Sequence, residues 1–365
     1  MQKELGMQSI QVGNRKIGIN EEPFIIAEMS GNHNGSKERA IEIIKRAAET
    51  GVDCLKFQTY TADTMTLNSH KSDFVINDAK SLWDGRQLHN LYQEAHTPWE
   101  WHEDLFKTAT DHGVIAFSSP FDETAVDFLN DLNVPMFKVA SFEITHLPLI
   151  RKIGQTGKPV IISTGMASVE EIETAIRTAK EGGTDDIIIL KCTSQYPANA
   201  SDANLATIAD MAERFGVQVG LSDHTLGIGV GIAAIGYGAT VIEKHFTIDR
   251  SEGGVDSDFS MEPHEMKALK EETSRAWHGR GKVHYEGTAN EQKSKQFRQS
   301  IYPSCDIAEG EIFSAENLKI CRPGLSLAPV HWEDLIGKPA KRGIEMGERL
   351  NICLLYTSPS PRDRG

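Results

Sequence analysis

Eight short apolar runs alternate with segments of helical periodicity, and this repeat narrows the folds open to the chain. The first run is FIIAE at 24–28, and Ala40, Ile44 and Ala47 then recur at helical spacing. The later runs are DCLKFQT, GVIAFSSPF, MFKVAS, PVIISTG, DIIILKCTS, VQVGLSDHT and TVIEKHFT. Strands that are apolar on both faces are typical of a parallel sheet covered by helices. The pattern predicts an α/β fold, a (β/α)8 TIM barrel, with a doubly wound open sheet as the alternative.

Segments outside the repeat predict the domain organisation. A hairpin turning at Gly13 and Asn14 is expected to close the bottom of the barrel, and residues 60–101 form a long insertion after the second strand. From about Phe297, short strands broken by Gly and Pro indicate a second, mostly-β domain. The expected divisions are a hairpin at 1–22, a barrel at 23–285, a truncated C-terminal domain at 286–352 and a non-native tail at 353–365.

Charge and cysteine usage exclude several classes of partner. The formal net charge is −14 and no dense basic run occurs, so we expect neither a nucleic-acid nor a membrane partner. The five cysteines include no C-x-x-C pair and suggest no disulfide framework. The first 30 residues lack a signal core, and the long uncharged run at 226–242 is short and rich in glycine. A cytoplasmic location is therefore predicted.

Polar side chains follow the apolar strands where each strand ends. Barrel enzymes keep their active sites at the carboxyl ends of the strands, and buried polar groups there are costly without ligands or partners. The residues at these tips are Glu28, Lys56, Gln58, Ser118, Ser119, Lys138, Ser141, Glu143, Ser194, Tyr196, Ser222, Asp223, His224, Glu243 and His245. The agreement of seven strand tips predicts one active site at this end of the barrel.

Two subsets of these residues predict different tasks. Lys56 and Lys138 interrupt apolar strands, which favours a buried cationic pocket for a phosphate and a carboxylate over surface lysines. His224 and His245 follow neighbouring strands and could converge on one divalent ion, with satisfied core histidines as the alternative. Asp223 should point away from His224 and act as a hydrogen-bond partner.

Taken together, these motifs resemble the sialic acid synthase family. The motifs are FIIAEMSGNHNGS, LKFQTYTADTMTL, FSSPFDETAVDFL, FKVASFEITHLPLI, IISTGMAS, GLSDHT and EKHFTIDR. The C-terminal SIYPSCDIAEGEIFSAENLKICRPG resembles the antifreeze-like (SAF) cap domain of that family. The resemblance covers about residues 8 to 350. Within the family, the EMSGNHNG, QTYTADTMTL, TPWEWH and SPFDETAVDF stretches look most like the pseudaminic acid synthases.

The resemblance implies a reaction and its ligands. Phosphoenolpyruvate would condense with 2,4-diacetamido-2,4,6-trideoxy-altrose, releasing phosphate and forming a nine-carbon 2-keto sugar acid. The implied cofactor is a divalent metal ion, Mn²⁺ first and Mg²⁺ or Co²⁺ as alternatives. The implied assembly is a homodimer in which the cap domain of one subunit acts on the other.

The resemblance also implies roles for individual residues. The phosphoenolpyruvate-binding set is Lys56, Ser119, Lys138, Ser141, Ser194 and Ser222. The sugar-binding set is Gln58, Asn77, Tyr196, Asp256 and Arg322, the last from the partner subunit. The catalytic set is Glu28, Glu143 and His245, and the metal set is His224 and His245. Ser194 stands where neuraminate synthases tend to carry Asn.

Other functions share part of this pattern. An N-acetylneuraminate or legionaminate synthase would differ only in its sugar. A metal-dependent barrel hydrolase would share the histidine pair but would not need two buried lysines beside strand-tip serines. An inactive sugar-binding fragment is the remaining alternative, and phosphate release that depends on an added aldehyde sugar separates the three.

Overall fold

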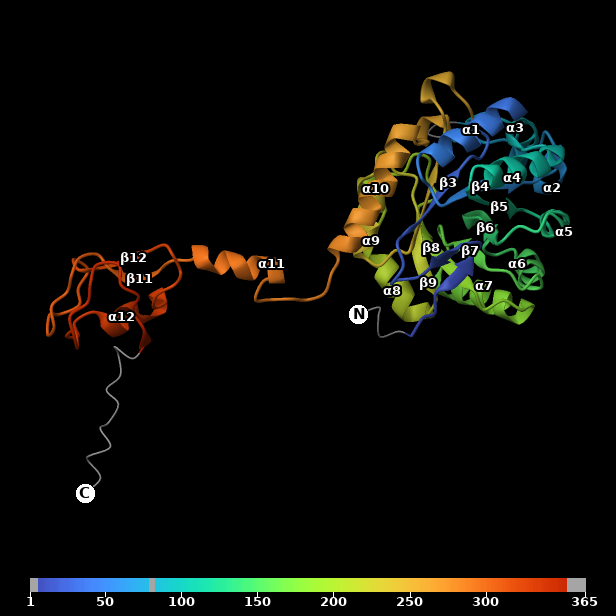
Figure 1. Cartoon of the computed structure of the whole chain (residues 1–365). Coiled ribbons are helices and arrows are strands. Elements are labelled where there is room, and N and C mark those ends of the chain that lie inside the picture. The colour runs from blue at the N-terminus through green and yellow to red at the C-terminus, as the bar shows by residue number, and fades with distance from the viewer. Residues whose placement is uncertain (1–5, 79–82, 353–365) are drawn as a thin grey trace. The chain divides into compact units, whose positions relative to one another are not determined.

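The chain forms two compact units in a computed structural model, which describes residues 6–78 and 83–352. The first unit ends at Gly281 and the second begins at Lys282 (Figure 1). Among the described helices, none is long and apolar enough to cross a membrane.

In the first unit, eight strands close into a parallel barrel. The strands are β3 (Phe24–Glu28), β4 (Cys54–Thr59), β5 (Ile115–Pro120), β6 (Phe137–Val139), β7 (Val160–Ser163), β8 (Ile187–Cys192), β9 (Gln218–Ser222) and β10 (Val241–His245). They neighbour one another in chain order, and β10 pairs with β3 so that His245 lies opposite Glu28. This closure confirms the TIM barrel and excludes the open sheet.

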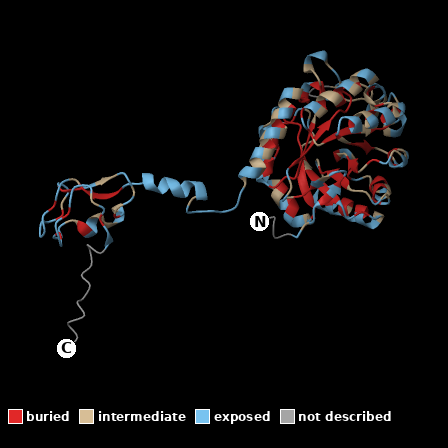
Figure 2. Ribbon diagram, viewed as in Figure 1, coloured by how far each residue is buried: buried red, intermediate tan, exposed pale blue. Residues whose placement is uncertain are grey.

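Helices cover the outside of the barrel. They are α1 (Lys37–Glu49), α4 (His102–Asp111), α5 (Glu123–Asp131), α6 (Leu147–Gly154), α7 (Val169–Gly182), α8 (Ala206–Phe215), α9 (Gly229–Gly236) and α10 (Pro263–Gly279). Their starts follow local sequence: the Ser36 side chain accepts from the backbone of Arg39, and Ser168 and Glu171 form a capping box. Buried residues concentrate in the strands and the inward helix faces (Figure 2).

An N-terminal hairpin closes the amino end of the barrel. Strands β1 (Ile10–Val12) and β2 (Arg15–Ile17) pair antiparallel around Gly13, whose φ of +54° suits glycine. Their buried side chains share a core cluster with Phe24 and Val241, which begin β3 and β10. The Asp53 carboxylate ties this end together, because it accepts from the backbone N–H of Ile25 at 2.8 Å and from Lys270 Nζ at 2.6 Å.

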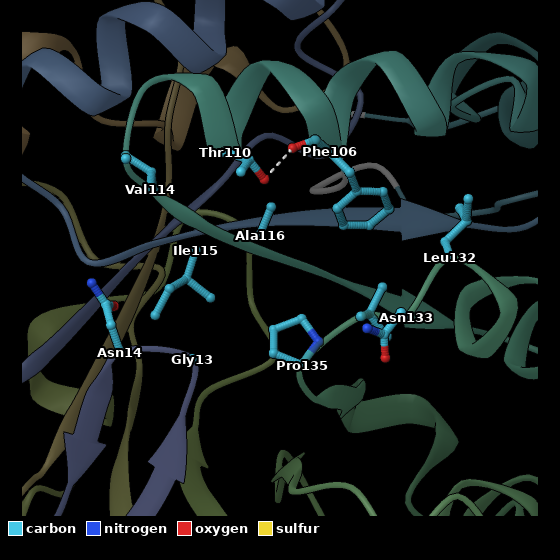
Figure 3. A pocket seen from close by; sticks show the side chains of 12 residues that line it. Gly13, Asn14, Phe106, Thr110, Val114, Ile115, Ala116, Leu132, Asn133 and Pro135 are labelled. Atoms are coloured by element: carbon cyan, nitrogen blue, oxygen red, sulfur yellow. Dashed lines mark hydrogen bonds between the residues drawn. The ribbon is translucent and has the colours of Figure 1, made fainter.

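A cavity of about 340 Å³ opens beside the hairpin turn (Figure 3). Its wall combines polar and apolar groups, and the Thr110 hydroxyl is already used, since it donates to the carbonyl of Phe106 at 2.9 Å. The cavity lies by the residues that begin β5, at the amino end of the strands. None of the site residues predicted from the sequence belongs to its lining.

Two excursions rise at the carboxyl end of the barrel. The first lies between β4 and α4 and contains α2 (Ala62–Met65), η2 (Ser72–Phe74), α3 (Leu88–Ala95) and η3 (Trp99–Trp101). The second follows β10 and contains η6 (Arg250–Glu252) and η7 (Ser257–Phe259). Short turns also follow β6 and β8, as η4 (Ser141–Glu143) and η5 (Ala200–Asp202).

The second unit has its own small core. It contains α11 (Ala289–Gln292), η8 (Lys293–Phe297), β11 (Ser300–Pro303), β12 (Leu318–Cys321), η9 (Pro329–His331) and α12 (Trp332–Leu335). The two strands pair antiparallel, and Ile301, Phe313 and Leu335 are buried in one cluster. A small C-terminal domain with a β-sheet was expected from the sequence. The expected non-native tail at 353–365 lies outside the described residues.

Candidate active site

The carboxyl ends of the barrel strands surround a cavity of about 680 Å³. Most of the strand-tip residues singled out in the sequence meet there. Those that line the cavity are Lys56, Gln58, Lys138, Ser141, Glu143, Ser194, Tyr196, Ser222, His224, Glu243 and His245, and Asp256 from the loop after β10 joins them. The closed parallel topology explains this convergence, because it brings the ends of strands far apart in sequence to one place.

Two buried lysines in this cavity share one carboxylate. Glu243 Oε1 lies 3.0 Å from Lys138 Nζ and 3.2 Å from Lys56 Nζ, and it also accepts from Ser222 Oγ at 3.2 Å. Lys56 Nζ is also 2.8 Å from Glu28 Oε2. Burial opposes ionisation of Glu243, but Lys138 and Lys56 hold its pKa well below the usual range. The cluster therefore presents two ammonium groups, held in place before any ligand arrives, to the cavity.

The two carboxyl groups predicted to transfer protons titrate near neutral pH. Burial raises the pKa of Glu28 to about 7, against the opposing effect of Lys56. Burial likewise raises the pKa of Glu143 to about 7. Glu143 Oε2 is buried without a hydrogen-bond partner in the described structure. Each carboxyl group can therefore give or take a proton at physiological pH, which is what general acid–base catalysis requires.

Hydroxyl groups complete the polar part of the cavity. Ser141 Oγ and Ser194 Oγ lie 2.8 Å apart, and Ser222 joins the lysine cluster through Glu243. Ser163, which ends β7, also lines the cavity, and its buried hydroxyl has no partner among the described residues. Such donors around two ammonium groups suit an anion with several oxygens.

The two histidines are close enough to act on one ion. The centroids of the His224 and His245 rings are 5.4 Å apart. His224 Nδ1 lies 2.9 Å from the carbonyl of Thr193, an arrangement in which Nδ1 donates. Burial disfavours protonation of His224, but its hydrogen bond and charge interaction with Cys192 raise its pKa. His245 Nδ1 is buried without a partner in the described structure, and burial holds the pKa of His245 well below its usual value. Two imidazoles this close fit a divalent metal ion, which would bind a deprotonated ring nitrogen of each.

Asp223 does not join the histidine pair. Its carboxylate accepts from Lys244 Nζ at 2.7 Å and from the backbone N–H and hydroxyl of Thr225. Both it and Lys244 are buried. This ion pair stands apart from the cavity lining, which agrees with the partner role expected for Asp223.

Among the described residues, one group of three acidic and histidine side chains brings its ligand atoms within 4.8 Å of one another. It consists of Glu262, His264 and Glu265 at the start of α10. Arg250 already pairs with both carboxylates, and none of the three lines the cavity. The described residues thus offer two possible metal positions, and of these two the histidine pair shares the cavity with the lysine cluster.

Three of the residues predicted to bind the sugar, Gln58, Tyr196 and Asp256, line this cavity. The Tyr196 ring centroid is 4.4 Å from that of His224, and Gln58 Nε2 donates to Glu28 Oε1 at 3.1 Å. Asp256 is held by the Ser30 hydroxyl and by the backbone N–H of Gly31 at 3.4 Å. Tyr196 therefore lies beside the histidine pair, whereas Gln58 shares the Glu28 carboxyl group with Lys56.

Four residues whose roles the resemblance implied do not line the cavity, and neither do the strand-tip residues Ser118 and Asp223. Glu28 is buried behind Lys56, and Ser119 is buried with an unpaired hydroxyl in the described structure. Asn77 is exposed, although its neighbours on both sides line the cavity. Arg322 is exposed and belongs to the second unit.

Sequence reasoning gave no role to two residues that the cavity contains. Glu243 precedes His245 by two positions and so shares its face of the strand, a signal available from the alternation of side chains. Ser163 ends β7 in the same way that the chosen serines end their strands. Both residues could therefore have been assigned to the site from their positions at the ends of β10 and β7.

Comparison with known proteins gives consistent matches over most of the chain. The NeuB family profile matches residues 43–285 and the SAF domain profile matches residues 298–350. A pseudaminic acid synthase from Campylobacter jejuni is 43% identical over 93% of this chain and 98% of its own length. An N,N'-diacetyllegionaminic acid synthase from the same species is 36% identical, over 89% of this chain and 98% of its own.

A solved structure agrees with these matches. It is an N-acetylneuraminic acid synthetase from Leptospira borgpetersenii, determined in complex with citrate. It superposes with a TM-score of 0.71 at 33% identity, over 80% of this chain and 96% of the other.

Proposed function

Since the chain belongs to the NeuB family, we propose that it is a pseudaminic acid synthase. It joins phosphoenolpyruvate to 2,4-diacetamido-2,4,6-trideoxy-altrose, forms a nine-carbon 2-keto sugar acid and releases phosphate. The enzyme class follows from the family, and the choice of sugar is supported by the higher identity to a pseudaminic acid synthase than to a legionaminic acid synthase.

One observation carries the proposal: two buried lysines share the Glu243 carboxylate in the cavity that also contains the His224–His245 pair. Ammonium groups and serine hydroxyls suit the phosphate and carboxylate of phosphoenolpyruvate. A metal-dependent hydrolase would have no use for the lysine cluster. A sugar-binding fragment would have no use for carboxyl groups that titrate near neutral pH.

The chemistry assigns a task to each group. Lys56 and Lys138 bind the phosphoenolpyruvate anion and fix the direction of its C3 carbon. That carbon forms a bond to the sugar aldehyde, water adds at C2, and the phosphate leaves. Glu28 or Glu143 supplies the proton that the former aldehyde oxygen receives. His224 and His245 would hold a divalent ion, for which we propose Mn²⁺ before Mg²⁺ or Co²⁺, that supplies Lewis-acid polarisation of the aldehyde.

We also propose a cytoplasmic location. The described cysteines, Cys54, Cys192, Cys305 and Cys321, are all free thiols, and this supports a reducing compartment.

A panel of sugars tests the proposed substrate. With phosphoenolpyruvate and Mn²⁺ present, we expect phosphate release to be fastest with the altro-configured diacetamido trideoxy sugar. Initial rates are to be compared with its legionaminate-type isomer and with N-acetylmannosamine. Faster phosphate release with either of those sugars would contradict the proposal and would identify the enzyme as a legionaminate or a neuraminate synthase, respectively.

The cap domain is proposed to complete the active site of a partner subunit in a homodimer. Arg322 is exposed in the second unit, next to a proline and a glycine, and a guanidinium there can reach a ligand without disturbing a core. We expect Arg322→Ala to raise the KM for the sugar about tenfold or more while metal binding stays unchanged, since a hydrogen bond from a charged group contributes about 1.5–3 kcal/mol.

Subunit mixing tests whether the arginine acts across the dimer. Inactive His245→Ala subunits are mixed with Arg322→Ala subunits and allowed to exchange. In a mixed dimer, one barrel has intact histidines and receives an intact arginine, so activity should rise above that of either parent. No recovery, with exchange verified by differently tagged subunits, would rule out a cap that acts on its neighbour.

A further inference from the structure

Helix α3 turns an apolar face toward the active-site cavity instead of toward a core. Leu88, Leu91, Tyr92 and Ala95 all line the cavity, and their spacing of three and four residues places them on one side of the helix. The polar residues of this helix are absent from the lining. This face is called the α3 stripe below.

Contacts on its flanks hold the α3 stripe in position. The Tyr92 ring meets the ring of Tyr60 edge to face at 5.8 Å, and Tyr60 meets Phe121 in the same way at 5.2 Å. His89, which projects from another side of α3, pairs with Asp63 of α2 at 2.9 Å. Aromatic packing and this tie give the helix one fixed orientation, so the stripe is a built wall of the cavity.

The α3 stripe is suited to a ligand group without hydrogen-bonding atoms. Apart from the Tyr92 hydroxyl, the α3 stripe offers no side-chain hydrogen-bonding atom, so a sugar hydroxyl against Leu88 or Leu91 would be left without a partner there, which is unfavourable. In the proposed sugar, both acetamido methyls are attached to amides that need polar partners. The C6 methyl is the one substituent that has no polar atom attached to it.

The orientation that the reaction requires of the sugar places its C6 methyl group far from Lys56 and Lys138. The aldehyde carbon C1 must meet phosphoenolpyruvate beside Lys56 and Lys138. In an extended open-chain hexose, C6 lies roughly 6 Å from C1, given carbon–carbon bonds of about 1.5 Å. The cavity is large enough for the chain to continue from the charged part to the insertion.

We propose that the α3 stripe is a methyl-binding subsite that selects 6-deoxy sugars over sugars with a 6-hydroxyl group. This inference rests on the proposed function and adds to it the residues that set the substrate class. Leu88 and Leu91 are the specificity-determining side chains, and the Tyr60–Tyr92–Phe121 cluster positions them.

The test compares two sugars that differ by one oxygen atom. The 2,4-diacetamido-2,4,6-trideoxy sugar and its 6-hydroxy counterpart are each assayed with phosphoenolpyruvate. We expect the wild-type protein to favour the 6-deoxy sugar in kcat/KM by about 10- to 100-fold, the range over which an apolar pocket discriminates against an added hydroxyl. Leu88→Asn should lower this ratio about tenfold and leave the KM for phosphoenolpyruvate unchanged.

A matched substitution controls for the change of residue type. Leu67 lies in the same insertion, is 66% exposed and does not line the cavity, so Leu67→Asn should keep the wild-type ratio. Calorimetric binding of the two unreactive C1 alcohols to the wild-type protein should show the same preference without turnover, so the test stands even if Leu88→Asn misfolds.

The possible results separate the inference from the proposed function. Turnover of both sugars at equal kcat/KM, or an unchanged ratio in folded Leu88→Asn, would overturn the methyl-binding subsite while the synthase activity stands. Absence of turnover and of binding for both sugars would overturn the proposed function and this inference with it.

Discussion

Replacing either His224 or His245 with alanine is expected to abolish metal-dependent turnover while the barrel stays folded. Each substitution removes one of the two imidazoles whose ring centroids lie 5.4 Å apart. Loss of a residue that only hydrogen-bonds to a metal ligand weakens metal binding by about 10- to 100-fold. Loss of a direct ligand should therefore weaken metal binding by more than this. Protein stripped with chelator is titrated with Mn²⁺, and both bound metal and phosphate release are measured.

A second substitution distinguishes the two possible metal positions. His264 belongs to the group at the start of α10, which lies outside the cavity lining. His264→Ala should therefore titrate with Mn²⁺ like the wild type. Full activity of His224→Ala or His245→Ala after the same titration would show that the histidine pair does not bind the metal. Loss of metal binding in His264→Ala would place the metal site at the start of α10 instead.

Lys138→Met is expected to raise the KM for phosphoenolpyruvate by about 10- to 100-fold and to change the KM for the sugar much less. A charged hydrogen bond to a buried anion contributes roughly 1.5 to 3 kcal/mol, and methionine retains most of the volume of the lysine stem. Glu243 keeps a cationic partner in this variant, because Lys56 Nζ lies 3.2 Å away. The barrel should therefore remain folded.

Steady-state kinetics with each substrate varied in turn measures this effect. Lys158→Met is the matched control, because Lys158 precedes β7 at the amino end of the barrel and does not line the cavity. A rise in the sugar KM alone would mean that the anion and sugar positions are reversed. Unchanged KM values for both substrates would show that Lys138 does not contribute to substrate binding.

The fold was predictable because the repeat is local and regular. Each strand is a continuous apolar run, and each helix shows its own periodicity and caps, so the barrel could be inferred one unit at a time. The convergence of His224 and His245 followed from the same logic, since neighbouring strand ends must meet in a closed parallel barrel. The hairpin that closes the amino end was also visible from its turn residues.

Other features depend on contacts that no local pattern carries. Glu243 could be placed beside His245, but its partners Lys56 and Lys138 come from β4 and β6 and meet it only across the barrel interior. Asn77 was assigned to the sugar site from the family resemblance, yet it is exposed while both of its neighbours line the cavity. The α3 stripe could not be predicted for a similar reason. The sequence of an amphipathic helix shows that it has an apolar face, but not whether that face packs against a core or lines a cavity.

The most direct test of the central claim is a product measurement with phosphoenolpyruvate, the altro-configured diacetamido trideoxy sugar and Mn²⁺. Mass spectrometry and phosphate determination follow the same reaction mixture. The proposed activity predicts one phosphate released for each nine-carbon 2-keto acid formed, and no phosphate release when the sugar is omitted. Phosphate release without sugar, or consumption of the sugar without a nine-carbon product, would contradict it.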